Sequence, residues 1–145
     1  MKAPIAIVDT NVVVAGLLTR DVASPVARVL DGMLTGRFSY LLSPALLREY
    51  REVLLRPAIA SRHRLTPTEM DAVLTELVAN ARWREPASEP GAPDPGDNHL
   101  WALLAQRDVV LVTGDRLLLE SPPAATSVLS ARSFLELLEL TATRP

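Results

Sequence analysis

Short runs of apolar residues alternate along the chain with longer stretches in which apolar positions recur every three or four residues. The continuous runs predict buried strands at residues 4–8, 38–42, 109–112 and 126–129. The recurring positions predict helices that begin near residues 25, 44, 66, 97, 116 and 133. Because helices alternate with short buried strands, we expect an α/β fold. It would hold a parallel sheet covered on both faces, in a single domain spanning residues 1–145.

Local signals set several of these boundaries. Ser24 and Ser43 each precede a proline, which combines a helix-capping residue with a residue suited to the first helical turn. Thr66 begins a capping-box pattern, while Gly36 and Pro57 are expected to end the two preceding helices. Stretches without such periodicity are predicted to be loops, at residues 16–24 and 86–96.

Composition narrows the chemistry. Fourteen of the 15 positive residues are arginines and the single lysine is Lys2, so a phosphate-binding P-loop and a Schiff-base enzyme are excluded. The absence of cysteine excludes thiol nucleophiles, disulfides and cysteine-ligated zinc. The net charge of −2 does not by itself indicate a nucleic-acid binder. Since neither a signal segment nor a membrane-spanning run is visible, we expect a soluble cytoplasmic protein.

Four acids stand where predicted elements meet: Asp9, Glu49, Asp97 and Asp115. Asp9 and Asp115 follow two predicted strands, and Asp97 and Glu49 lie near the starts of two predicted helices. In a parallel sheet these positions share the edge at the carboxyl ends of the strands. Crowded carboxylates resist ionisation unless a cation joins them. The acids therefore predict a Mg²⁺ or Mn²⁺ site that activates water for phosphodiester cleavage.

Each acid also has a simpler interpretation. Asp97 and Asp115 are well placed to cap helices, and Glu49 is compatible with a solvated helix face. Asp9 is harder to explain in this way, because an unpaired charge at the end of a buried strand is costly. Neighbouring polar residues are predicted either to support the acids by hydrogen bonds or to act as plain turn and cap residues: Thr10, Asn11 and Thr113.

The combination resembles the PIN-domain nucleases, and within them the branch of VapC-type toxins. The resemblance covers nearly the whole chain and rests on four motifs: Val8-Asp9-Thr10-Asn11-Val12, Ser43-Pro44-Ala45-Leu46-Leu47-Arg48-Glu49-Tyr50, Asp94-Pro95-Gly96-Asp97-Asn98-His99 and Val112-Thr113-Gly114-Asp115. It implies a PIN-like α/β/α sandwich, a Mg²⁺ or Mn²⁺ cofactor and endoribonuclease activity. It also implies a small antitoxin partner and a homodimer.

Carried onto this chain, the family's acidic positions fall on the four acids named above, and Asp94 matches an extra acid of this branch. Gly96 departs from the pattern, since relatives often carry a further acid there. Five arginines crowd the region of the second motif and either contact RNA phosphates or form a solvated face. The candidates for RNA contacts are Arg48, Arg51 and Arg56, and the other two arginines of the region are Arg62 and Arg64. We expect His99 to pack or to hydrogen-bond locally, and Trp101 to pack in the core.

Three other functions differ in how well the sequence fits them. A phosphatase with an aspartyl nucleophile would need a second aspartate where Asn11 stands, together with a later lysine. A PIN nuclease of RNA processing or DNA, and a metal-free PIN-like interaction module, both remain compatible with the sequence.

Overall fold

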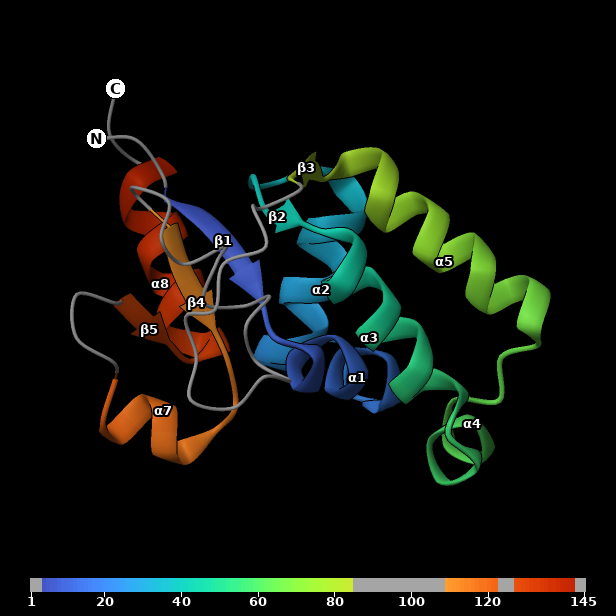
Figure 1. The fold of residues 1–145 in the computed structure, drawn as a ribbon. Coiled ribbons are helices and arrows are strands. Elements are labelled where there is room, and N and C mark those ends of the chain that lie inside the picture. Colours follow the sequence, from blue (N-terminus) through green and yellow to red (C-terminus); the bar gives the residue numbers. More distant parts are fainter. Residues whose placement is uncertain (1–3, 85–108, 123–126, 143–145) are drawn as a thin grey trace.

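The computed structural model describes residues 4–84, 109–122 and 127–142 (Figure 1). Three parallel strands form one sheet in the order β1 (Ile5–Val8), β4 (Val109–Val112) and β5 (Ser127–Leu129). A second parallel pair joins β2 (Leu41–Leu42) to β3 (Arg82–Trp83). A parallel bridge between Ala6 and Tyr40 connects the two sets next to β1. The predicted α/β fold with a parallel sheet is confirmed.

Helices flank the sheet (Figure 1). Their bounds are α1 (Thr10–Leu18), α2 (Pro25–Thr35), α3 (Pro44–Leu55), α4 (Pro57–His63), α5 (Pro67–Asn80), α7 (Arg116–Glu120) and α8 (Ala131–Ala142). α1 packs against α2 and α3, while α8 packs against α2 and β5. The core fills the space between these layers and includes every residue of β4 and most of β1.

The predicted helix boundaries have the expected local causes. The side chains of Ser24 and Ser43 accept hydrogen bonds from backbone N–H groups in the first turns of α2 and α3. Thr66 and Glu69 form a reciprocal capping box at the start of α5. Gly36 ends α2 in the left-handed conformation, with φ 71°, which a residue without a Cβ adopts at no steric cost.

Two helices were not predicted. The expected loop at 16–24 is wrong at its start, because α1 continues to Leu18. The run Val12–Val14 has a low helix propensity, but Asp9 caps the helix and all three valines become buried. Pro57 ends α3 as expected, yet it also occupies the first position of α4, a role that proline fills equally well.

Smaller differences concern the strands and one helix face. Only Leu41–Leu42 of the strand expected at 38–42 is regular, and β3 was not predicted. On α5, Met70, Leu74 and Leu77 are buried, whereas Val78 is exposed. The predicted helix at 97–106, the loop at 86–96 and the first residue of the strand at 126–129 lie outside the described residues. None of the described helices combines the length and the apolar character that a membrane-spanning segment requires.

Candidate active site

Two parallel strands place two aspartates at one edge of the sheet. In the β1–β4 pairing Val8 lies opposite Val112, and the Asp9 N–H donates to the Val112 carbonyl at 2.9 Å. Each aspartate also caps the helix that follows it. The Thr10 N–H donates to Asp9 Oδ1 at 2.8 Å, and the Leu117 N–H donates to Asp115 Oδ1 at 2.9 Å. The capping role considered for Asp115 is thus present, and Asp9 has one as well.

The other oxygen of Asp9 belongs to a network that links both strand ends. Thr113 Oγ1 donates to Asp9 Oδ2 at 2.8 Å, and Asn11 Nδ2 reaches the same oxygen at 3.3 Å. Thr113 Oγ1 also accepts from Asn11 Nδ2 at 3.3 Å and from the Asp115 N–H at 3.0 Å. Asn11 Oδ1 in turn accepts from the Gly114 N–H at 3.0 Å. One buried hydroxyl therefore orients Asp9 and the backbone of Asp115 together.

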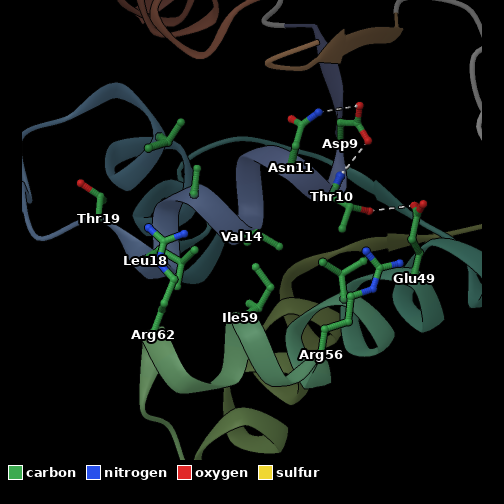
Figure 2. A pocket seen from close by; sticks show the side chains of 13 residues that line it. Asp9, Thr10, Asn11, Val14, Leu18, Thr19, Glu49, Arg56, Ile59 and Arg62 are labelled. Carbon is green, nitrogen blue, oxygen red and sulfur yellow. Dashed lines mark hydrogen bonds between the residues drawn. The ribbon is translucent and has the colours of Figure 1, made fainter.

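The third acid comes from α3. Thr10 Oγ1 donates to Glu49 Oε2 at 2.7 Å, which joins Glu49 to the first residue of α1 (Figure 2). The neighbouring Tyr50 is fully buried, and its hydroxyl donates to the carbonyl of Val8, the residue before Asp9. Burial raises the pKa of Tyr50 well above its usual range, so the hydroxyl stays a donor. This contact fixes the second turn of α3 beside the carboxyl end of β1.

Burial raises the pKa of Asp9 above its ordinary value of 3.8. The hydrogen bonds from Thr113 and the Thr10 N–H act in the opposite direction and favour the carboxylate, while the charges of Glu49 and Asp115 raise the pKa further. The three acids therefore interact electrostatically. A positive charge placed among them would be stabilised.

The potential metal ligands at this edge of the sheet suit a hard cation, because they are carboxylate, hydroxyl and amide oxygens and the chain contains no cysteine. Among the described residues, no three carboxylate or histidine side chains gather closely enough to hold a metal ion by themselves. Asp97 and Asp94, together with His99 and Trp101, lie outside the described residues. The predicted four-acid set is therefore visible only as the trio Asp9, Glu49 and Asp115.

A cavity of about 690 Å³ opens beside Asp9 and runs along α1 (Figure 2). The acids Asp9 and Glu49 lie at one end, and Leu18 and Thr19 lie at the other. The opposite wall comes from the end of α3 and from α4. Its lining is Asp9, Thr10, Asn11, Val14, Ala15, Leu18, Thr19, Val26, Glu49, Val53, Arg56, Ile59 and Arg62.

The candidate RNA-contacting arginines are not equivalent. Arg56 lines the cavity, Arg51 forms an ion pair with Asp71 at 3.6 Å, and Arg48 is exposed without lining the cavity. Arg62 also lines the cavity but was not singled out among its neighbours in the sequence. Pro57 could have indicated this position in the sequence. If Pro57 is interpreted as the start of a helix, Arg56 and Arg62 lie at the two ends of α4.

Comparison with known proteins identifies a family whose model matches most of the chain. The model is described as PIN domain and matches residues 6–117. Among solved structures, the chain is similar to the T. brucei RRP44 PIN domain, with 16% sequence identity and a TM-score of 0.48. That match covers 98% of this chain and 84% of the other. Curated proteins yield no match.

Proposed function

We propose that this chain, which belongs to the PIN domain family, is a divalent-metal-dependent endoribonuclease that hydrolyses RNA phosphodiester bonds. PIN domains are generally nucleases and usually use divalent metal ions. One observation carries the proposal. Asp9, at the carboxyl end of β1, is held by three hydrogen-bond donors, and its pKa is raised by burial and by the charges of Glu49 and Asp115.

The proposed roles follow from the positions of the acids. Asp9 and Asp115 would bind Mg²⁺ or Mn²⁺ most directly, while Glu49 and Asp97 would bind a second ion or orient the attacking water. Asp94 would be auxiliary, and its role, like that of Asp97, comes from the motif resemblance alone. When bound, the ion would lower the pKa of water and stabilise the leaving oxygen.

The chain's own hydrogen bonds would prepare these ligands. Thr113 and the Thr10 N–H favour the ionised form of Asp9, the form that binds a cation. Thr10 Oγ1 holds Glu49 from α3, and Asn11 bridges Asp9 and Thr113. Such supporting contacts orient a metal ligand, and their loss typically costs roughly 10–100-fold in metal affinity or activity.

A finer form of the proposal is that the protein is a VapC-type toxin with a small antitoxin partner, forming a homodimer in the cytoplasm and acting as a single domain over residues 1–145. The toxin role, the antitoxin and the homodimer are supported by the motif resemblance alone. A small upstream reading frame with a DNA-binding pattern would support the toxin role, and sequencing cleavage sites after induced expression would identify the RNA. A nuclease of RNA processing or DNA, or a metal-free module, is the alternative.

The central test compares Asp9→Asn with the wild type in RNA cleavage assays containing Mg²⁺, Mn²⁺ or EDTA. We expect metal-dependent cleavage by the wild type and a loss on the order of a hundredfold or more in the variant. Asp31→Asn is the matched control, because Asp31 is exposed on α2 away from the cavity. Undiminished activity in Asp9→Asn rejects the assignment.

Binding of the metal alone provides a second measurement. Mg²⁺ or Mn²⁺ should raise the melting temperature of the wild type, because a ligand at about a hundred times its dissociation constant adds about 2.7 kcal/mol to the free energy of unfolding. The shift should be smaller in Asp9→Asn and unchanged in Asp31→Asn. Calorimetric titration with no heat for either ion would favour the metal-free interaction module.

A further inference from the structure

The cavity combines two kinds of lining in a regular order. Figure 2 shows Arg56, Ile59 and Arg62 facing α1, with Arg56 nearest Glu49 and Arg62 nearest Leu18. Between the two arginines the walls are apolar, with Ile59 directed towards Val14. A cation, an apolar surface and a second cation therefore follow one another away from the acids.

The two arginines are available to a ligand. Neither Arg56 nor Arg62 forms an ion pair with any residue in the described part of the chain, whereas Arg28 and Arg51 do. They lie six positions apart, which corresponds to roughly 9 Å along a helix axis, so two long side chains can reach adjacent phosphates of one strand. Guanidinium groups bind phosphate oxygens in a bidentate manner, so this pair fits two successive phosphates.

The apolar stretch between them suits the face of a base or ribose. Val14, Leu18 and Ile59 contribute hydrocarbon at this point, and α1 and α4 satisfy their interior backbone N–H and C=O groups within the helices. An extended peptide would therefore find few main-chain partners there. The volume of about 690 Å³ falls within the range of pockets that hold one small organic group.

We propose that this cavity binds one unpaired nucleotide next to the phosphodiester bond that the acids would cut, with Arg56 and Arg62 on its flanking phosphates. The inference rests on the proposed nuclease function and adds to it a binding subsite formed by Arg56, Ile59 and Arg62. A base inside a duplex is stacked and paired and cannot enter a side cavity, so the substrate at this position is single-stranded. The scarcity of hydrogen-bonding groups along the apolar stretch makes this subsite tolerant of base identity.

The test measures binding without cleavage. A fluorescent ten-nucleotide single-stranded RNA is titrated in EDTA against the wild type and Arg56→Ala/Arg62→Ala, and binding is followed by anisotropy. We expect affinity to fall at least tenfold for each arginine, because each substitution removes charge-assisted hydrogen bonds. The slope of log affinity against log salt should also become shallower by about 0.7 for each phosphate that an arginine no longer neutralises.

A matched control separates the loss of the two cavity arginines from a general loss of positive charge. Arg37→Ala/Arg132→Ala removes two exposed arginines outside the cavity and changes the net charge by the same amount. It should bind like the wild type. The cavity variant should still fold, because Arg56 closes α3 and opens α4 through its backbone and makes no side-chain cap; melting curves check this.

Two further probes address the unpaired nucleotide. A hairpin duplex should bind weakly and lose little affinity in Arg56→Ala/Arg62→Ala. Ile59→Ala should weaken binding of the single strand but not of the same strand carrying an abasic site at the bound position. Equal affinities for the cavity and control variants, equal losses for duplex and single strand, or no binding by the wild type would overturn the proposal and leave a protein segment as the occupant.

The two proposals can fail separately. Metal-dependent cleavage that is identical in the wild type and in Arg56→Ala/Arg62→Ala keeps the nuclease and rejects the nucleotide subsite. Arginine-dependent binding of single strands by a wild-type protein that cleaves no RNA keeps the subsite and rejects the nuclease.

Discussion

Asp9 and Asp115 occupy similar places in the fold, directly after β1 and three residues after the end of β4, but they differ in their surroundings. Each follows a four-residue strand, the two strands pair in parallel, and each aspartate caps the next helix. Asp9 is half-buried and receives hydrogen bonds on both oxygens, whereas Asp115 is exposed. The helix after Asp9 has nine residues and buries four of them, while the helix after Asp115 has five residues and buries none.

The difference shows that the strand–aspartate–helix pattern does not by itself decide what the carboxylate experiences. α1 lies against α2 and α3, so the carboxylate at its start is drawn out of water and its pKa rises. α7 packs mainly against β5 among the described elements, and its cap remains in solvent. Chemistry that needs a desolvated, firmly held carboxylate is therefore expected to depend on Asp9 more than on Asp115.

Among the residues that support the two aspartates, the largest effect is expected at Thr113, whose hydroxyl joins them. Thr113→Val removes a donor to Asp9 and an acceptor for Asn11 and the Asp115 N–H, at a fully buried position. We expect a loss of about 1–3 kcal/mol in the free energy of unfolding and a roughly 10–100-fold fall in cleavage. Urea denaturation and initial rates measure the two quantities.

Thr113→Ser keeps the hydroxyl and should retain most of the free energy of unfolding and most of the cleavage rate. Double-mutant cycles sharpen the comparison: the coupling of Thr113→Val to Asp9→Asn should exceed its coupling to Asp115→Asn, because the Thr113 hydroxyl contacts the side chain of one and only the backbone of the other. Equal couplings would mean that the two aspartates are equivalent after all.

An intermediate effect is expected at Tyr50, whose hydroxyl anchors the end of β1 and has no described counterpart beside β4. Tyr50→Phe should cost about 1 kcal/mol of unfolding free energy by leaving a buried carbonyl with one bond fewer. Tyr40→Phe is the matched control, because Tyr40 is equally buried and donates to the Leu77 carbonyl away from the acids. Only Tyr50→Phe should also lower cleavage; equal activities would show that the anchor does not position the site.

The smallest expected effect is at Asp9, in the dependence of the free energy of unfolding on pH. Because the pKa of Asp9 is raised in the folded state, Asp9 keeps its proton to a higher pH in the native protein than in the unfolded chain. Stability contributed by protonated Asp9 is present below its ordinary pKa of 3.8 and is lost as the pH rises towards the raised value. In EDTA, Asp9→Asn should therefore gain stability relative to the wild type as the pH rises through this window, as followed by urea unfolding. Parallel curves would contradict the raised pKa.

The positions of Asp9, Glu49 and Asp115 in the fold were predictable from the sequence, because strand ends and helix starts are well marked by short-range signals. Asp9 and Asp115 follow continuous apolar runs, and Ser43-Pro44 sets the register that places Glu49 in the second turn of α3. Parallel topology then brings them to one edge. The hydrogen-bond partners Thr10, Asn11 and Thr113 were named for the same reason, since they adjoin these acids.

The cavity was not predictable in the same way. Its two facing walls come from α1 and α4, the helices that the periodicity missed: the first contains a run of valines, and the second begins at a proline that was interpreted only as a stop. Gly16 on α1 lies so close to α2 that an added Cβ would stand 2.8 Å from the Val26 carbonyl oxygen. Such a contact depends on tertiary packing, which local patterns do not encode.

The junction between α3 and α4 has a consequence for how a ligand is selected. Arg56 is at once the last cap of one helix and the first cap of the next, and Pro57 restricts the backbone rotation that would change the angle between them. With no intervening loop to rearrange, this side of the cavity is preorganised, and little conformational entropy is spent on shaping it around a guest. The cavity would then select among ligands by how much each ligand must change its own conformation to enter.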